Sequence, residues 1–225
     1  MTRTAYIVSH THWDREWYET YQQFRLRLVR LMDKLLHILD TDPSYLYFML
    51  DGQTIVLEDY LEIRPEREAD LRRHIRSGRL LIGPWHVLPD EFLVSGEAIV
   101  RNLLLGKRTC AQFGGRMPVG YIPDPFGHIS QIPQILRGFG MASAALRRGL
   151  DEHPTELNWQ SPDGSTVLLC YLRDGYDNAA RLPVHSGEAF VREVRRLTDR
   201  LAPFSPTTNV LLMNGVDHME PVPEL

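Results

Sequence analysis

The stretch Ala5-Tyr-Ile-Val-Ser-His-Thr-His-Trp-Asp14 places a short apolar run directly before a cluster of polar residues. The run at residues 5–9 is rich in β-prone side chains and predicts a strand. Polar side chains that follow a strand at once are typical of a parallel α/β sheet, in which ligands bind at the carboxyl ends of the strands. We therefore expect residues 10–14 to form a strand tip with a chemical role.

The same order of apolar strand, polar or acidic tip and amphipathic helix recurs along the chain. It predicts an α/β domain with a mostly parallel seven-stranded sheet or an irregular β/α barrel. Because the sequence stops at Leu225, soon after a strand tip, we expect this domain to be incomplete at its carboxyl end. Further strands are predicted at 45–50, 80–82, 119–122, 142–146, 166–171 and 209–213, and helices at 21–39, 54–63, 66–77, 96–113, 132–139 and 191–201.

Composition excludes several classes of protein. The net charge of −4 and the absence of a basic patch argue against a nucleic-acid partner. No apolar run is long enough for a membrane span or a signal peptide, so a cytoplasmic location is expected. Cys110 and Cys170 form no CxxC pair, which predicts two free thiols.

His12 and Asp14 are candidate metal ligands. An H-x-D pair in extended conformation projects both side chains to the same face of a strand. Imidazole and carboxylate together suit a divalent transition metal. Taken alone, however, such a pair is more often a simple hydrogen-bonded contact.

Two further carboxylates follow predicted strands. Asp124 lies between Pro123 and Pro125, which restrict its backbone and suit a nucleophile that needs a rigid mount. Asp217 follows Asn-Gly-Val at the tip of the last strand. Either could be a turn residue, but two carboxylates at separate tips are what glycoside hydrolysis requires. Trp17 could stack on a sugar or fill the core.

Several motifs in this order resemble glycoside hydrolase family 38, the zinc α-mannosidases, and its bacterial branch in particular. The resemblance spans nearly the whole chain, and the joint occurrence of the motifs is highly specific. The matching stretches are His10-Thr-His-Trp-Asp-Arg-Glu-Trp-Tyr18, Leu50-Asp-Gly-Gln-Thr54, Gly83-Pro-Trp-His-Val-Leu-Pro-Asp-Glu-Phe92, Tyr121-Ile-Pro-Asp-Pro-Phe-Gly-His128, Arg148-Gly149 and Asn214-Gly-Val-Asp217.

The resemblance implies a retaining α-mannosidase that forms a covalent mannosyl-enzyme. It implies that His12, Asp14 and Asp124 bind one Zn²⁺, that Asp124 is also the nucleophile, and that Asp217 is the general acid/base. The implied substrate is a mannoside or a mannose-containing oligosaccharide. The substrate-binding candidates are Trp17, Phe126, Arg148 (with Arg147 as a competing alignment), Asp90 and Tyr176.

The sequence departs from the family pattern at its carboxyl end. The family's fourth zinc ligand is a histidine far downstream of the nucleophile, and His218 does not match its position. The family's helical bundle and β domains are also absent, so residues 1–225 are interpreted as an N-terminal catalytic segment. A metal-dependent carbohydrate deacetylase and an inactive, carbohydrate-binding barrel fragment that forms homo-oligomers stay open as alternatives.

Overall fold

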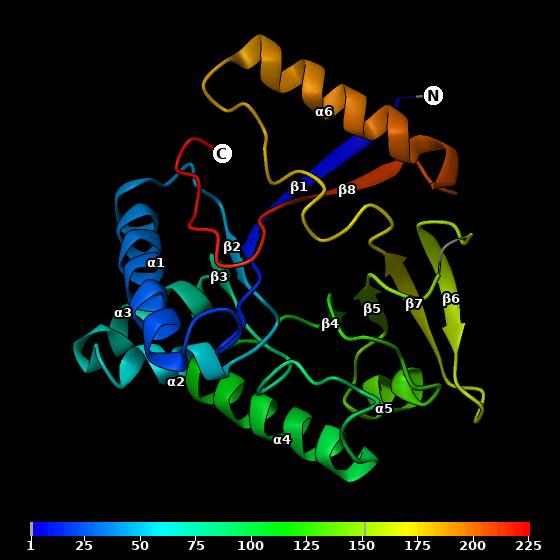
Figure 1. The fold of residues 1–225 in the computed structure, drawn as a ribbon, viewed down its shortest axis with the longest axis horizontal. Helices are drawn as coiled ribbons and strands as arrows, with labels where there is room; N and C mark the ends of the chain where they lie inside the picture. The colour runs from blue at the N-terminus through cyan, green and yellow to red at the C-terminus, as the bar shows by residue number, and fades with distance from the viewer. Residues whose placement is uncertain (1, 151) are drawn as a thin grey trace. The chain divides into compact units, whose positions relative to one another are not determined.

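The computed structural model describes residues 2–150 and 152–225, which divide into two compact units (Figure 1). Strand β1 (Thr4–Thr11) and helix α4 (Gly96–Phe113) contribute residues to both units. Unit 1 comprises Met1–Val8, Leu88–Leu104 and Pro118–Asn214, and unit 2 comprises Ser9–Val87, Leu105–Met117 and Gly215–Leu225.

Unit 2 is built around helix α1 (Tyr21–Thr41). Thr20 begins the helix, and its backbone N–H donates to Gln23 Oε1 at 3.0 Å, which satisfies a donor that the first turn leaves unpaired. Apolar side chains recur at helical spacing and are fully buried at Phe24, Leu28 and Leu35, so one face of α1 forms the core. Helices α2 (Ile55–Leu61) and α3 (Glu68–Arg76) complete the core, with a short 3₁₀ turn at Pro65–Arg67 between them.

The strands of unit 2 are short and parallel. β1 pairs with β2 (Phe48–Leu50), with His10 opposite Met49, and β2 pairs with β3 (Leu80–Leu81). Every residue of β2 is buried, as expected of a central strand in a parallel sheet. A parallel bridge between His12 and Asp217 continues the pairing beyond the end of β1. The carboxyl ends of β1 and β2 therefore present residues 12–14 and 51–53 at one edge.

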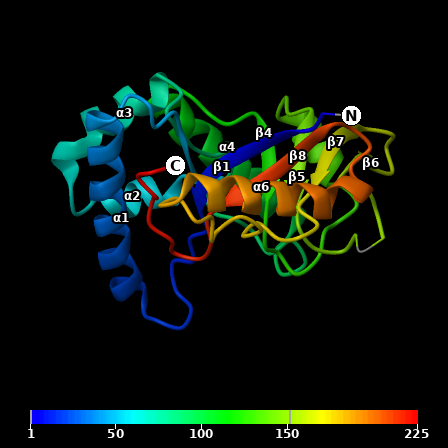
Figure 2. The ribbon, with the colours of Figure 1, turned by 90° about the horizontal axis from the view of Figure 1, so that it is seen from above.

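Unit 1 contains a second sheet, in the order β4-β5-β7-β6. β4 (Val119–Ile122), β5 (Ser143–Leu146) and β7 (Thr166–Tyr171) are parallel, whereas β6 (Glu156–Gln160) runs antiparallel to β7. Helix α5 (Ile132–Gly138) lies against β7. Helix α6 (Gly187–Leu201) runs alongside β8 (Asn209–Asn214), with a 3₁₀ turn at Ala202–Phe204 between them (Figure 2).

The predicted α/β class with mostly parallel pairing is confirmed. The strands of the described residues, however, form two four-stranded sheets, ordered β3-β2-β1-β8 and β4-β5-β7-β6, rather than the single seven-stranded sheet expected. The additional strand, β6, was missed because its Glu-Leu-Asn-Trp-Gln sequence carries few β-branched residues. It forms through its pairing with β7, which is a tertiary contact that local propensity does not report.

The two cysteines are free thiols, as predicted. Burial raises the pKa of Cys110 to about 11 and that of Cys170 to about 12, which favours the protonated thiol at neutral pH. Among the helices of the described residues, none has the length and apolar character needed to span a bilayer.

Candidate metal and carboxylate site

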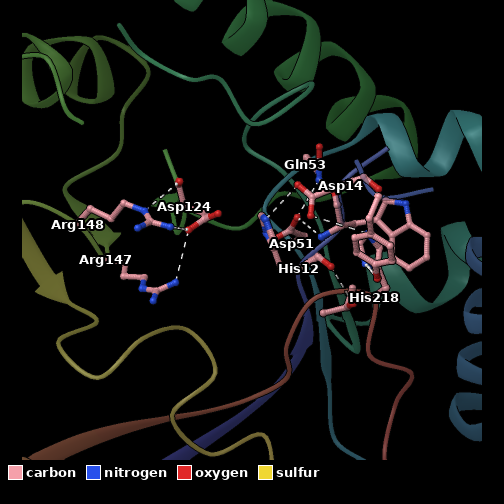
Figure 3. A network of polar contacts seen from close by, with 11 residues as sticks. His12, Asp14, Asp51, Gln53, Asp124, Arg147, Arg148 and His218 are labelled. Carbon is pink, nitrogen blue, oxygen red and sulfur yellow. Dashed lines mark hydrogen bonds and ion pairs between the residues drawn. The ribbon is translucent and has the colours of Figure 1, made fainter. Parts of the chain in front are cut away.

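His12 lies just past the end of β1 and is held by a buried carboxylate (Figure 3). Its Nδ1 is 3.0 Å from Oδ1 of Asp51, a side chain with no exposed surface. The other carboxylate oxygen of Asp51 accepts a hydrogen bond from the backbone N–H of Trp13 at 2.7 Å and another from Nε2 of Gln53 at 2.8 Å. We call this arrangement, in which Asp51 contacts the His12 ring and the Trp13 amide, the Asp51 clamp.

Asp14 lies on the other side of the same imidazole. Its Oδ1 is 3.5 Å from His12 Nε2, and its Oδ2 is buried without a hydrogen-bond partner among the described residues. Burial opposes charge on His12, but the carboxylates of Asp51 and Asp14 outweigh it and raise the pKa of His12 well above its ordinary value. Burial likewise opposes charge on Asp14, but His12 and His218 outweigh it and lower the pKa of that carboxyl. Without a bound cation, the two carboxylates thus favour an imidazolium between them.

His218, next to the predicted acid/base Asp217, packs beneath Asp14. Its backbone N–H donates to the carbonyl of His12 at 2.8 Å, and its Nε2 lies 3.1 Å from the carbonyl oxygen of Asp14. The ring stacks on Phe24 with centroids 4.1 Å apart, and burial lowers its pKa. With the bridge between His12 and Asp217, these contacts bring the tip of residues 216–218 beside the predicted ligands in unit 2.

The aromatic residues of this segment divide into two kinds. Trp13 is buried and belongs to the core of unit 2. Trp17 and Tyr18, by contrast, are 61% and 60% exposed. The alternative that Trp17 fills the core is therefore not what the structure shows.

Asp124, in unit 1, follows β4 and is held by two guanidinium groups (Figure 3). Arg148 Nη2 lies 2.5 Å from Asp124 Oδ1, and Arg147 Nη1 lies 3.5 Å from the same oxygen. Each arginine also covers an aromatic ring, Arg148 that of the exposed Phe126 and Arg147 that of the buried Tyr176. Both arginines therefore contact Asp124, and Arg148 makes the closer contact.

A second buried carboxylate in unit 1 holds the loop that follows Asp124. Glu91, which is 1% exposed, places Oε1 2.9 Å from His128 Nδ1 and accepts a hydrogen bond at Oε2 from the Ile129 N–H at 2.7 Å. We call this arrangement the Glu91 clamp. Its neighbour Asp90 accepts a 3.3 Å hydrogen bond from the Phe126 N–H.

Neither clamp carboxylate has a role predicted from the sequence. The available signal is that Asp51 and Glu91 lie within motifs that match the family, Asp-Gly-Gln and Pro-Asp-Glu. Their partners lie 39 and 37 residues away in the chain, so their contacts follow from folding. Asp90, predicted to line a substrate site, is seen to support the loop backbone.

The metal ligands predicted from sequence are divided between the units. His12 and Asp14 come together in unit 2, whereas Asp124 belongs to unit 1. Within residues 2–150 and 152–225, no group of three or more His, Cys, Asp or Glu side chains is arranged to hold a metal ion. The donor chemistry of His12 and Asp14 nevertheless fits a divalent cation, because an oriented imidazole faces a carboxylate with one buried oxygen that accepts no hydrogen bond from the described residues.

Comparison with known proteins gives the family. The model of the "Glycosyl hydrolases family 38 N-terminal domain" matches residues 2–224. A candidate mannosylglycerate hydrolase of Halalkalibacterium halodurans is 45% identical over 97% of this chain and 26% of its own length. The crystal structure of an α-mannosidase from Enterococcus faecalis V583 superposes with a TM-score of 0.95 at 35% identity, over the whole chain and 26% of that protein.

A candidate polysaccharide deacetylase from Mycobacterium smegmatis shares the fold alone, with a TM-score of 0.55 at 16% identity over 97% of this chain and 78% of that one. The chain spans about a quarter of the length of its family 38 relatives. The match of a family model to almost every residue, together with the two close relatives, shows that the chain belongs to glycosyl hydrolase family 38 and corresponds to its N-terminal domain.

Proposed function

We propose that this chain is the N-terminal catalytic segment of a retaining, zinc-dependent α-mannosidase. The observation that carries the proposal is the His12–Asp14 pair, in which a clamped imidazole lies 3.5 Å from a carboxylate whose Oδ2 accepts no hydrogen bond from the described residues and lies 3.9 Å from His218 Nε2. Two carboxylates, the buried Asp51 and the partly exposed Asp14, flank one imidazole and favour a positive charge there. In the metal-free protein an imidazolium supplies that charge, and a cation bound at His12 Nε2 and Asp14 would supply it in place of the Nε2 proton.

His12 Nε2 and Asp14 are the proposed protein ligands in unit 2, and the family resemblance adds Asp124 of unit 1. Imidazole and carboxylate are ordinary ligands of Zn²⁺. When bound, zinc would supply a Lewis acid that holds and polarises sugar hydroxyls. The remaining chemistry belongs to residues of the chain itself.

Asp124 is the proposed nucleophile. Its Oδ1 faces Arg148 and Arg147, and the flanking prolines restrict its backbone, so the carboxylate is held in one orientation. In a retaining mechanism this carboxylate attacks the anomeric carbon and forms a glycosyl ester. Asp217, which bridges to His12 in unit 2, is proposed to protonate the leaving oxygen and then to deprotonate the attacking water.

Two exposed aromatic side chains are proposed to contact the sugar, Trp17 in unit 2 and Phe126 in unit 1. Apolar ring faces stack well on the C–H faces of a pyranose, whereas an exposed aromatic contributes little to folding. Arg148 is proposed to contact both the substrate and Asp124. Asp90 and Tyr176 are proposed to support the sugar site indirectly. Asp90 accepts a hydrogen bond from the Phe126 N–H, and the Tyr176 ring packs against the Arg147 side chain.

The name of the relative from H. halodurans suggests which α-mannoside to test first. The purified protein should be incubated with zinc and either α-mannosylglycerate or p-nitrophenyl α-mannoside, and the products followed by proton NMR. We expect mannose to appear first as the α-anomer, because two displacements retain the configuration. Release of the β-anomer would contradict the retaining mechanism. A parallel incubation with an acetylated sugar tests the alternative, because release of acetate there, with no mannose from either mannoside, would favour a deacetylase.

A further inference from the structure

We propose that Asp51 is a positioning residue, which sets the tautomer and the orientation of His12 for metal binding. The proposal rests on the proposed function, because it takes His12 as a metal ligand. It assigns a role to a carboxylate that does not itself face the predicted metal.

Three hydrogen-bond donors converge on the fully buried Asp51 carboxylate (Figure 3). His12 Nδ1 approaches Oδ1 at 3.0 Å, while the Trp13 N–H and the Gln53 amide approach Oδ2 at 2.7 and 2.8 Å. Both oxygens are thus used as acceptors. A buried side chain in this position has to accept hydrogen bonds at two atoms. An ionised carboxylate can do so, whereas an amide has only one acceptor oxygen.

This arrangement dictates the tautomer of His12. Because Asp51 Oδ1 accepts from Nδ1, the proton of a neutral imidazole stays on Nδ1 and the lone pair is on Nε2. Nε2 is the nitrogen that lies 3.5 Å from Asp14. In its neutral form the ring is therefore oriented, and carries its proton on Nδ1, as a metal ligand at Nε2 requires, which is the usual role of a carboxylate behind a ligating histidine.

The same segment also fixes the backbone between the two proposed ligands. Asp51 holds the N–H of Trp13, and Gln53 Nε2 donates to the carbonyl of Trp13 at 2.8 Å. Trp13 is the residue between His12 and Asp14, so both polar groups of the connecting backbone are held by residues 51–53. Asp51 itself adopts φ +48°, in the left-handed region that few side chains tolerate, and Gly52 follows at φ +65°. The tight turn brings the carboxylate and the Gln53 amide back onto one backbone unit.

The Asp51→Asn variant is the decisive test. Asparagine offers one acceptor oxygen to three donors, so its NH₂ group must face either His12 or both Trp13 and Gln53. If the oxygen keeps the Trp13 and Gln53 contacts, the amide donates to His12 Nδ1, and neutral His12 must carry its proton on Nε2. We expect zinc affinity, measured by competition with a chelator, to fall about 10- to 100-fold. We also expect the imidazole ¹⁵N shifts of the metal-free protein, at a pH where His12 is neutral, to show the change of tautomer.

Asp59→Asn is the matched control. Asp59 is a buried carboxylate of unit 2 whose two oxygens accept hydrogen bonds from Arg15 and Tyr21. This variant should lose stability and keep both the wild-type zinc affinity and the His12 tautomer. Should Asp51→Asn fail to fold, Asp51→Glu keeps two acceptor oxygens but displaces them, and it should retain the tautomer while weakening zinc binding.

The outcomes separate the two proposals. Equal zinc affinity and an unchanged His12 tautomer in Asp51→Asn would overturn the positioning role and leave the proposed function intact. Failure of the wild-type protein to bind zinc would contradict the proposed function, and the ¹⁵N spectra would still decide whether Asp51 sets the tautomer. An equal loss of zinc affinity in Asp51→Asn and Asp59→Asn would also overturn the proposal, because the loss would then follow from general destabilisation.

Discussion

The Asp51 clamp of unit 2 and the Glu91 clamp of unit 1 use the same local geometry. In each, a buried carboxylate places one oxygen on the Nδ1 of a histidine, at 3.0 Å for His12 and 2.9 Å for His128. In each, the other oxygen accepts from the backbone N–H of the next residue, at 2.7 Å in both cases. One side chain thus fixes a ring and the peptide that follows it.

The two clamps differ in what the opposite nitrogen of the ring meets. His12 Nε2 faces the Asp14 carboxylate, whereas His128 Nε2 is buried without a hydrogen-bond partner among the described residues, near the edge of Trp159. The first clamp therefore orients the proposed metal ligand His12, and the second holds His128 and Ile129 in the loop that follows Asp124 and Phe126. A histidine–carboxylate pair alone therefore does not identify a metal-binding or catalytic site. The group that faces the other ring nitrogen distinguishes the two cases.

The largest effect on kcat is expected at Asp124, just before the loop that the Glu91 clamp holds. Asp124→Asn removes the proposed nucleophile and should lower kcat on an activated α-mannoside by more than about a thousandfold. The fold should persist, because the asparagine amide is nearly isosteric with the carboxylate. Circular dichroism checks the fold, and turnover close to that of the wild type would rule out the nucleophile assignment.

The two arginines on Asp124 give a matched pair with a smaller effect. Arg148 lies 2.5 Å from the carboxylate and Arg147 lies 3.5 Å from it. Arg148→Ala should therefore lower kcat by roughly tenfold to a hundredfold, which corresponds to loss of one charge-assisted hydrogen bond. Arg147→Ala should lower it by less. If the order of the two variants were reversed, the closer contact would not be the one that positions Asp124.

Glu91→Gln compares the two clamps directly. Glutamine offers one acceptor to two donors, but His128 can move its proton to Nε2, because that nitrogen has no partner to lose. We expect a loss of about 1–3 kcal/mol in the free energy of unfolding, measured with urea. Zinc affinity should fall less than in Asp51→Asn. A larger fall in zinc affinity in Glu91→Gln than in Asp51→Asn would contradict this. It would show that the loop held by Glu91, and not the orientation of the His12 ring, determines zinc affinity.

The smallest effect is expected at a third histidine–carboxylate pair, Asp40–His74 in unit 2. Asp40 Oδ1 lies 2.7 Å from His74 Nε2 and also contacts Arg73, but Asp40 is partly exposed and holds no adjoining backbone amide in the described contacts. Burial opposes its charge, but His74 and Arg73 outweigh burial and lower its pKa.

Because the folded-state pKa of Asp40 lies below the unfolded value, its contribution to stability is present above the ordinary carboxyl pKa and is lost as pH falls through the lowered one. Asp40→Asn should therefore destabilise the protein slightly at neutral pH, and the difference from the wild type should vanish in acid. Urea unfolding at a series of pH values measures it. A difference that grew as pH fell would contradict the sign of this linkage.

Much of the fold could be predicted from the sequence, because its strands and helices carry strong local signals. Helix α4 and strands β4 and β7 have the predicted boundaries. The division into two sheets could not be predicted, since pairing order depends on contacts between distant segments. Strand β6 was missed for the same reason, as its pairing with β7 supplies the stability that its own residues lack.

The candidate site shows the same limit. His12 and Asp14 could be found because an H-x-D spacing directly after a strand is itself a local geometry, and the structure brings them together. Asp51 and Glu91 could not be assigned, because each acts on a histidine more than 30 residues away in the chain. The predicted roles of Asp124, Asp217 and the substrate-binding residues stay predictions until they are measured.

The zinc content of the purified protein tests most directly whether His12 and Asp14 are metal ligands. The purified protein and its His12→Ala and Asp14→Ala variants should be equilibrated with zinc, dialysed and analysed for metal content. We expect the wild type to retain zinc and each variant to lose most of it. Equal zinc content in all three proteins would contradict the assignment of His12 and Asp14 as metal ligands.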